Sequence, residues 1–134
     1  MAKVIRKAGV PAPGRVLRIG VMPVSEMRAR TIAIARGELK PSPTDPKVWI
    51  SSAEAAGKIL SSKNVELLEH IRRSRPTSLQ ALSSSSGRKV ASLSRTLRLM
   101  EKYGIVKLEP GERGALRPEV PFDELDLQIR LSAS

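Results

Sequence analysis

The order of elements between residues 64 and 118 constrains this chain more than any other feature. Short helical patterns are followed by a Ser and Gly break, a basic amphipathic helix, and two short strands joined by a loop with two glycines. In the helical patterns, apolar residues recur at spacings of three and four, as one face of a helix requires. The sequence therefore predicts a small helical core with a β-hairpin attached to its last helix.

The basic helix is predicted over residues 88–103, after a break formed by the serines at 83–86 and Gly87. Its apolar stripe, which we expect to face a core, consists of Val90, Leu93, Leu97 and Met100. Long cations and hydroxyls, the groups that contact guanine edges and phosphate oxygens, fall on the opposite side. They are Arg88, Ser92, Arg95 and Lys102, with Thr96 beside them. The alternative is a solvated cationic face on an ordinary helical domain. Gly104 is placed to end the helix in a left-handed conformation.

A β-hairpin is predicted directly after this helix. Its strands cover residues 105–108 and 116–120, and its loop covers residues 109–114 with Arg113 at the tip. An arginine at such a tip is suited to entering a minor groove or meeting a phosphate. The alternative is a plain surface turn with a solvated arginine.

Two further helices are predicted upstream. The first covers residues 63–73, with Ser61 or Ser62 as its cap, and ends at Arg75-Pro76. The second follows Thr77 or Ser78 and continues through Leu82. Three helices packed through their leucines form the kind of core on which a DNA recognition helix is mounted. The predicted fold class is therefore α+β, with a winged helix-turn-helix over residues 61–121.

Several motifs support the same prediction by resemblance. The chain is similar to predicted transcriptional regulators with a winged-helix domain of the broad MarR-like type, in particular a small prokaryotic group of DNA-binding proteins, some of which resemble antitoxins. The resemblance covers residues 15–131. It is carried by Arg18-Ile19-Gly20-Val21-Met22-Pro23, Ala33-Ile34-Ala35-Arg36-Gly37-Glu38, Pro46-Lys47-Val48-Trp49, Leu93-Ser94-Arg95-Thr96-Leu97, Tyr103-Gly104-Ile105-Val106 and Arg117-Pro118.

The resemblance implies a sequence-specific DNA-binding protein that represses, with Ser94 and Arg95 on the DNA-facing helix. Helical projection places Ser94 closer to the core edge than Arg95. The family often carries an amide before Leu-Ser-Arg, whereas this chain has Ser92, which has a shorter reach.

Residues 1–60 divide into a tail and a mixed segment. The basic tail, residues 1–14, contains Pro11, Pro13 and Gly14 near its end and is predicted to be mobile, either as an idle extension or as an arm along phosphates. Residues 15–60 predict a strand at 15–22, a helix at 25–36, a proline-rich linker at 40–47, a short strand at 48–50 and a helix capped by Ser52.

The last segment, residues 122–134, is predicted to be a strand used for dimerisation. Residues Leu125, Leu127, Ile129 and Leu131 alternate with polar ones, so one face should be buried and the other wet. Its expected partner is the strand at 15–22, in the same subunit or in a second one. The sequence thus predicts a homodimer, with an intramolecular pair in a monomer as the alternative.

Composition favours a nucleic acid as the partner. The net charge is +11 and the sequence pI is about 10.9, above the value of about 9 that marks an electrostatic footprint for nucleic acid. Only three aromatic residues are present, which disfavours base stacking as the mechanism. There is no cysteine, hence no disulfide or thiolate metal site. No apolar run approaches the ~18 residues of a membrane span, so a cytoplasmic location is expected.

The sequence offers little for catalysis, and no enzyme activity, cofactor or metal is expected. His70, the only histidine, is interpreted as a surface residue because it lacks ligands at a matching spacing. The carboxylates of Asp123, Glu124 and Asp126 are interpreted as a solvated strand edge rather than a catalytic pair. No phosphate-binding glycine loop or nucleophile elbow is present.

The resulting hypothesis is a DNA-binding transcriptional regulator that acts as a repressor. Arg95, Arg88 and Ser92 are predicted to reach the major groove, Lys89 and Lys102 to hold phosphates, and Arg113 to act from the hairpin. One alternative is an antitoxin that binds a toxin protein and autoregulates its operon. The other is a non-specific nucleic-acid-binding protein or RNA binder.

Overall fold

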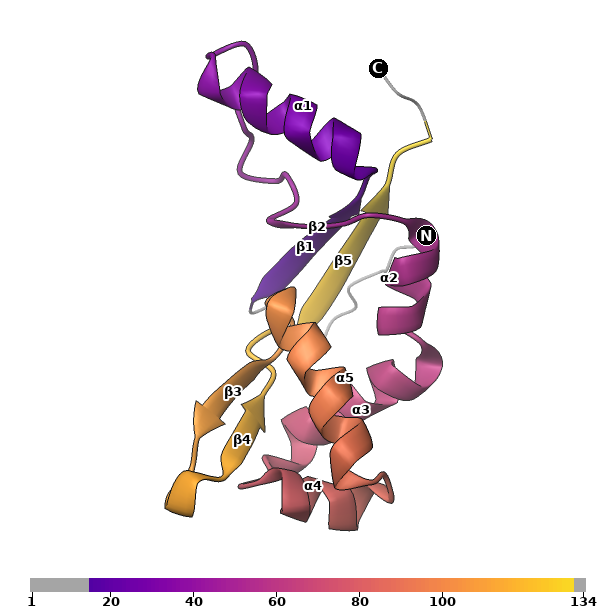
Figure 1. The fold of residues 1–134 in the computed structure, drawn as a ribbon, viewed down its shortest axis with the longest axis vertical. Coiled ribbons are helices and arrows are strands. Elements are labelled where there is room, and N and C mark those ends of the chain that lie inside the picture. The colour runs from indigo at the N-terminus through magenta and orange to yellow at the C-terminus, as the bar shows by residue number, and fades with distance from the viewer. Residues whose placement is uncertain (1–14, 132–134) are drawn as a thin grey trace, which may run out of the picture.

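The computed structural model describes residues 15–131, so the predictions for residues 1–14 and 132–134 lie outside it. In the described part the fold is α+β, with five helices, a parallel three-stranded sheet and a β-hairpin (Figure 1). The elements in chain order are β1 (Val16–Val21), α1 (Val24–Ala35), β2 (Val48–Ile50), α2 (Ala53–Ile59), α3 (Ser62–Ser74), α4 (Leu79–Ser86), α5 (Val90–Lys102), β3 (Lys107–Pro110), a 3-10 turn (Glu112–Gly114), β4 (Leu116–Glu119) and β5 (Glu124–Ile129).

The three-stranded sheet joins the two ends of the described chain in the order β2-β1-β5. Both pairings are parallel, and Leu17, Ile19 and Val21 of β1 are in register with Leu125, Leu127 and Ile129 of β5. The pairing predicted between the N-terminal and C-terminal strands is thus present, and it lies within one chain. Residues at matching positions of a parallel pair share one face of the sheet, so these six side chains point the same way.

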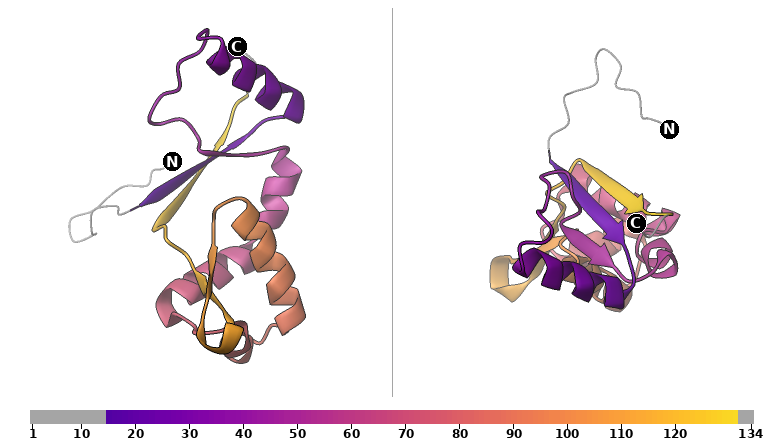
Figure 2. Two further views of the ribbon diagram at one scale, coloured as in Figure 1. Left: turned by 60° about the vertical axis from the view of Figure 1, so that its left-hand side comes forward. Right: turned by 90° about the horizontal axis from the view of Figure 1, so that it is seen from above.

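That face is buried only in part. Leu17, Ile19 and Ile50 belong to the core, whereas Leu127 and Ile129 are 42% and 48% exposed and Leu131 is 99% exposed. The apolar face of the last strand, which the sequence predicted to be buried, is therefore only partly buried within the single chain. The residues of β1 and β2 on this face are buried, whereas those toward the end of β5, which forms one edge of the sheet next to β1 (Figure 2), are exposed.

The core continues from the sheet into α3, α4 and α5 as one cluster. Its most buried helical residues are Leu67, Leu68, Ile71, Leu82, Leu93, Leu97 and Met100. The cluster crosses the predicted segment boundary at residue 60, because Ile59 of α2 packs in the same core. In the described residues no helix is long and apolar enough to cross a membrane.

Serine side chains fix the first turns of three helices. Ser52, Ser61 and Ser78 each accept a hydrogen bond from the backbone N–H three residues later, at 3.0, 3.3 and 3.0 Å. Each bond satisfies a donor that the first turn of a helix leaves without an intrahelical partner. The cap of Ser52 is confirmed, and Ser61 and Ser78 are the caps where the sequence left two candidates each.

The serine run at 83–86 is helical, so the predicted break there is wrong. These residues complete α4, and the chain turns at Gly87, which has φ +77°. Ser83 Oγ donates to the Arg88 carbonyl at 2.6 Å, and Ser86 Oγ accepts from the Arg88 N–H at 3.2 Å. These bonds hold Arg88 in the turn, so α5 begins at Val90 rather than at Arg88. Val90, predicted to face the core, is 38% exposed and is not part of the core.

A Schellman motif ends α5 at Gly104, as the sequence predicted for this glycine. Gly104 has φ +75°, its N–H donates to the Glu101 carbonyl, and the Ile105 N–H donates to the Met100 carbonyl. Ile105 and Val106 are buried in the core but precede the strand, which covers Lys107–Pro110 instead of residues 105–108. Ile105 and Val106 are therefore held by packing in the core and do not pair with another strand.

Candidate nucleic-acid interface

The buried stripe of α5 determines which residues of this helix face solvent. Leu93, Leu97 and Met100 each have 0% exposure. Successive residues are separated by roughly 100° around the helix axis, so the side opposite these three carries Arg95, Arg98 and Lys102, all exposed. Lys89, the residue at the N-cap position, is exposed as well. Packing of the three apolar residues thus fixes the orientation of Arg95, Arg98 and Lys102.

The charge around α5 is strongly one-sided. Between residues 77 and 103 the sequence has five lysines and arginines and one acidic residue, Glu101. Exposed charges interact over about 8 Å at physiological ionic strength, so neighbouring cations on one helix act together. A phosphate chain is the natural counterpart of such a surface.

Arg88, in the turn before α5, and Thr96 of α5 lie on the side of this helix that faces α3. The half-buried Arg88 side chain places Nη1 3.3 Å from Asn64 Oδ1 and Nη2 3.5 Å from Thr96 Oγ1. Both residues were predicted to reach DNA, but in this structure they contact each other and link α5 to α3. A guanidinium has five N–H donors, so Arg88 retains donors while it holds this link.

Ser92 lies on the same flank, at a shallow hollow of about 640 Å³ between α3 and the α4-α5 turn. Cationic and polar side chains surround it, among them Lys63, His70, Arg73 and Arg88. The His70 Nε2 atom is 2.8 Å from Ser85 Oγ, so the histidine joins α3 to α4. The described residues contain no group of three or more His, Cys, Asp or Glu side chains arranged to hold a metal ion.

Ser94 lies on the opposite flank and reveals a residue that the sequence argument missed. Its Oγ atom accepts a hydrogen bond from Arg98 Nε at 3.3 Å. Arg98 is exposed and adds a cation to the outward face between Arg95 and Lys102. The i to i+4 spacing of Ser94 and Arg98 is the signal from which this pair was predictable.

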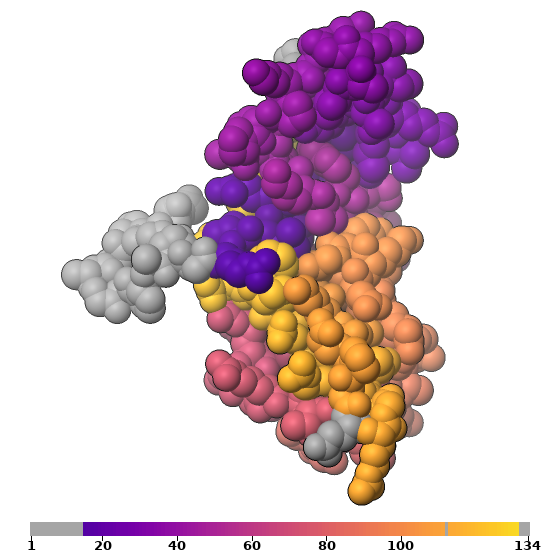
Figure 3. Space-filling model, turned by 90° about the vertical axis from the view of Figure 1, so that its left-hand side faces the viewer, coloured from indigo at the N-terminus to yellow at the C-terminus, as the bar shows by residue number. Residues whose placement is uncertain are grey.

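The charged residues of the hairpin lie in two places, on its paired strands and at its turn. In the antiparallel register Lys107 is opposite Glu119 and Glu109 is opposite Arg117, and opposite charges across a sheet stabilise the pairing. Arg113 lies outside this register, at the turn, with φ +55° and an exposed side chain. The hairpin extends from the body of the molecule at its lower end (Figure 3). The predicted position of Arg113 at the tip is confirmed.

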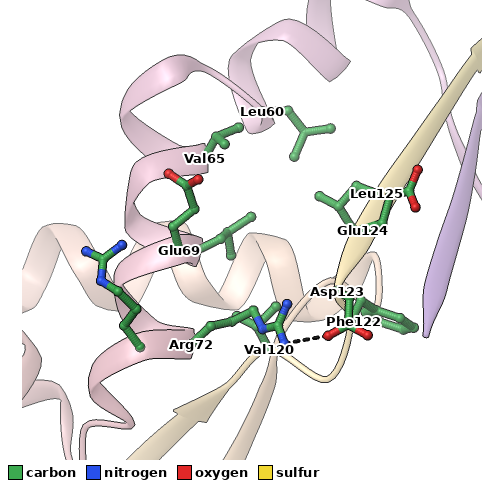
Figure 4. A pocket seen from close by; sticks show the side chains of 11 residues that line it. Leu60, Val65, Glu69, Arg72, Val120, Phe122, Asp123, Glu124 and Leu125 are labelled. Atoms are coloured by element: carbon green, nitrogen blue, oxygen red, sulfur yellow. Dashed lines mark hydrogen bonds and ion pairs between the residues drawn. The ribbon is translucent and has the colours of Figure 1, made fainter. Parts of the chain in front are cut away.

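A second hollow, of about 680 Å³, lies between α3 and the start of β5 (Figure 4). Its walls are mainly apolar, and the side chains of Leu60, Val65 and Leu125 point into it. At its rim Arg72 forms an ion pair with Asp123, which also accepts the Arg15 backbone N–H at 3.0 Å. This carboxylate therefore has a structural role between α3 and β1.

The carboxylate of Asp126 also has a cationic partner in the sheet. Its Oδ2 atom is 3.7 Å from Arg18 Nε on the adjacent strand. The two residues are in register between β1 and β5. The ion pair is half-exposed and belongs to the polar face of the sheet, in agreement with its interpretation as a strand-edge group.

The sequence matches a protein-family model over its second half. A family model described as HVO_A0114 matches residues 59–127, just over half of the chain. The matched segment contains α3, α4, α5 and the hairpin, and it ends within β5. No curated protein matches the sequence. No solved structure matches the fold.

Proposed function

This chain belongs to the HVO_A0114 family, and we propose that it is a sequence-specific double-stranded DNA-binding regulator that represses transcription. In this proposal α3, α4, α5 and the β3-β4 hairpin form a winged helix-turn-helix of the MarR-like type. The observation that carries the proposal is the orientation of α5. Its buried stripe turns Arg95, Arg98 and Lys102 outward, next to a hairpin that ends in Arg113.

Arg95 is the proposed base-reading residue. It lies in the first half of α5, opposite the buried stripe, and a guanidinium can donate two parallel hydrogen bonds to guanine O6 and N7. Lys89 and Lys102 lie near the two ends of the helix, where the phosphates that flank a major groove would run. Arg98 adds a further phosphate contact beside Ser94.

Arg88, Ser92 and Thr96 have a different proposed role. The hydrogen bonds of Arg88 to Asn64 and Thr96 hold α5 against α3, so Arg88 and Thr96 set the angle at which the helix meets the duplex. Ser92 lies beside them and lines the hollow next to α3. Arg113 contacts the sugar-phosphate backbone or the minor groove beside the site.

Fluorescence anisotropy tests the proposal with a duplex from the upstream region of the gene and a scrambled duplex, each from about 50 to 200 mM salt. Preference for the native duplex that persists at the higher salt supports a sequence-specific repressor. Equal affinities that collapse together with salt support the alternative of non-specific nucleic-acid binding.

Two substitutions locate the interface. Arg95→Ala should weaken binding to the native duplex by about 1 to 3 kcal/mol and reduce the preference over the scrambled duplex. Lys102→Ala should weaken both duplexes alike and reduce the salt slope by about one unit. Lys58→Ala, at an exposed lysine of α2, is the matched control and should change neither property. Unchanged affinity in both test variants would show that another face binds DNA.

An antitoxin role is a second candidate, and α1 is the observation that favours it. This helix buries none of its residues and exposes Val24 and Ile32, each by 50%. Such a helix offers apolar contacts to another protein. Co-expression with the product of an adjacent gene tests this candidate: a stable complex that Ile32→Asp disrupts supports it, and separate elution of the two proteins contradicts it.

A further inference from the structure

The outer edge of β5 has a defined backbone orientation. β5 is an edge strand in the order β2-β1-β5, and no strand in the described residues pairs with its other side. The Asp123 N–H donates to the Arg15 carbonyl at 2.8 Å. Backbone groups alternate in direction along a strand, so those of Leu125 and Leu127 point to β1, while those of Asp126 and Gln128 point away from the sheet. An edge of this kind is a template for another strand.

The same edge carries exposed apolar side chains. Ile19 of β1 has 0% exposure, yet Leu127, its partner in register, is 42% exposed, and exposure increases along β5 to Leu131. The core face of the sheet therefore continues past the area that the helices cover. The hollow between α3 and β5 lies beside this uncovered strip, since Leu125 belongs to both.

We propose that a second copy of this chain covers the strip, by antiparallel pairing of the two β5 strands around a two-fold axis at Leu127. In this register Leu127 lies opposite Leu127 of the second copy, Leu125 lies opposite Ile129, and Asp126 lies opposite Gln128. Glu124 then comes opposite Arg130, which adds charge complementarity at both ends of the pairing.

The sequence of β5 selects this register over its neighbours. Centring the pairing on Asp126 places two aspartates directly opposite each other, and like charges at such positions destabilise a sheet. Centring it on Gln128 brings Glu124 opposite residue 132, so fewer residues of Glu124–Ile129 find a partner within the strand. Shifts of a single position between the strands would place apolar side chains opposite polar ones.

The register also supplies an occupant for the hollow in Figure 4. Ile129 and Leu131 of the second copy come opposite Leu125 and Asp123, on the face where the hollow opens. Leu131, the most exposed apolar side chain in the described part of the chain, would then pack near Leu125 and the apolar residues of α3. One contact explains the open edge, the exposed strip and the apolar hollow together.

This inference goes beyond the proposed function and does not depend on DNA binding. If the chain binds DNA, the two-fold axis of the dimer would relate the two α5 helices in the way that the two halves of a palindromic site require. The tests below contain no DNA, so their failure leaves the proposed DNA-binding role intact, and failure of DNA binding leaves the dimer intact.

Disulfide trapping tests the register, and the absence of cysteine from the chain makes each introduced thiol unique. Leu127 opposite itself is a non-hydrogen-bonded pair, for which Cα atoms lie about 4.5 Å apart, within the range of about 4.4 to 6.8 Å for a disulfide. Leu127→Cys should therefore form covalent dimers under mild oxidation. Gln128→Cys, the matched control, should not, because Gln128 lies opposite Asp126. Equal trapping of both variants, trapping of neither, or stronger trapping of Gln128→Cys overturns the proposal.

Sedimentation equilibrium at micromolar protein tests the interface itself. The wild-type chain should have twice the 14.6 kDa mass of one chain. Leu127→Arg should be monomeric, because it brings two like charges together at the axis. Leu99→Arg is the matched control, since Leu99 is 43% exposed on α5 and should leave the dimer intact. A monomeric wild-type protein or a dimeric Leu127→Arg variant contradicts the proposal, and circular dichroism confirms that each variant is folded.

Discussion

Helices α1 and α5 have nearly the same length, 12 and 13 residues, but opposite relations to the core. Helix α5 has three residues with 0% exposure, whereas α1 has no buried residue. They differ in the arrangement of apolar residues, which form one stripe on α5 and surround α1. The two helices lie apart in the molecule, with α1 beyond the sheet and α5 among the other helices (Figure 1). Similar helical segments can therefore be held by quite different forces.

Helix α1 is attached to the rest of the molecule by polar and cation-π contacts, whereas α5 is held by buried apolar side chains. Arg30 Nη2 is 3.1 Å from Asp45 Oδ2, and the Arg30 guanidinium carbon is 5.4 Å from the centre of the Trp49 ring. These contacts connect the middle of α1 to the segment before β2. Ion pairs that are still partly accessible to solvent, such as this one, contribute little to stability compared with buried leucines, so substitutions in the two helices should have unequal effects.

The largest effect is expected from Leu97→Ala in α5. Removal of a fully buried leucine side chain leaves a cavity and typically costs about 2 to 5 kcal/mol. The matched substitution in α1, Ile32→Ala, removes a side chain that is 50% exposed and should cost about 0.5 kcal/mol or less. Urea denaturation followed by circular dichroism measures both free energies of unfolding. Similar losses in the two variants would contradict the comparison, and would mean that a partner buries α1 in solution.

Gly20→Ala is expected to have the next largest effect, and it marks the place where the N-terminal half is tightly packed. A Cβ atom at Gly20 would lie 2.2 Å from Cζ3 of Trp49 and 2.9 Å from Cγ of Pro46. The indole ring must move, and overpacking of this kind costs about 1 to 3 kcal/mol.

The fluorescence of Trp49, the one tryptophan of the chain, reports the displacement of the ring in Gly20→Ala. Gly57→Ala is the control, because a Cβ at Gly57 of α2 meets no atom within 4 Å. Alanine favours a helix interior over glycine by about 0.5 to 1 kcal/mol, so this control should be neutral or more stable. An unchanged emission spectrum and stability in Gly20→Ala would contradict the packing around Trp49.

The sequence predicted well those features that depend on neighbouring residues. The caps at Ser52, Ser61 and Ser78 and the glycine that ends α5 follow from local hydrogen bonding. The buried stripe of α5 follows from spacing alone, and it places Arg95 outward without any knowledge of the tertiary structure. The hairpin and the position of Arg113 at its turn were predictable for the same reason.

Features that depend on distant residues were beyond the sequence argument. Arg88 faces α3 because Asn64, 24 positions earlier, offers an acceptor, and helical projection contains no information about that neighbour. The serines at 83–86 have weak helix propensity and favour caps and turns, but here they are helical because Leu82 of α4 has 0% exposure in the core. Alternation in β5 predicted which face of the strand is apolar. How much of that face is buried depends on where the helices pack against the sheet, and the sequence pattern contains no information about this.

The smallest effect is expected from Asp45→Asn, which tests the polar attachment of α1. The Ser42 backbone N–H, which donates to the Asp45 carboxylate at 2.8 Å, is the main reason that the pKa of Asp45 lies below its ordinary value of 3.8, and Arg30 lowers it further. A carboxylate whose pKa is lower in the folded chain stabilises it above the unfolded pKa, and this contribution disappears as the pH falls through the folded pKa.

The difference in Tm between the wild-type protein and Asp45→Asn should therefore be constant from neutral pH to about pH 5 and then shrink toward zero below the ordinary value of 3.8. Other carboxylates titrate in both proteins and cancel in this difference. A difference that stays constant to pH 2 would show that Asp45 acts through shape rather than through charge. In that case α1 would owe its attachment to Trp49 and the sheet, and its contrast with α5 would be weaker than the ion pair suggests.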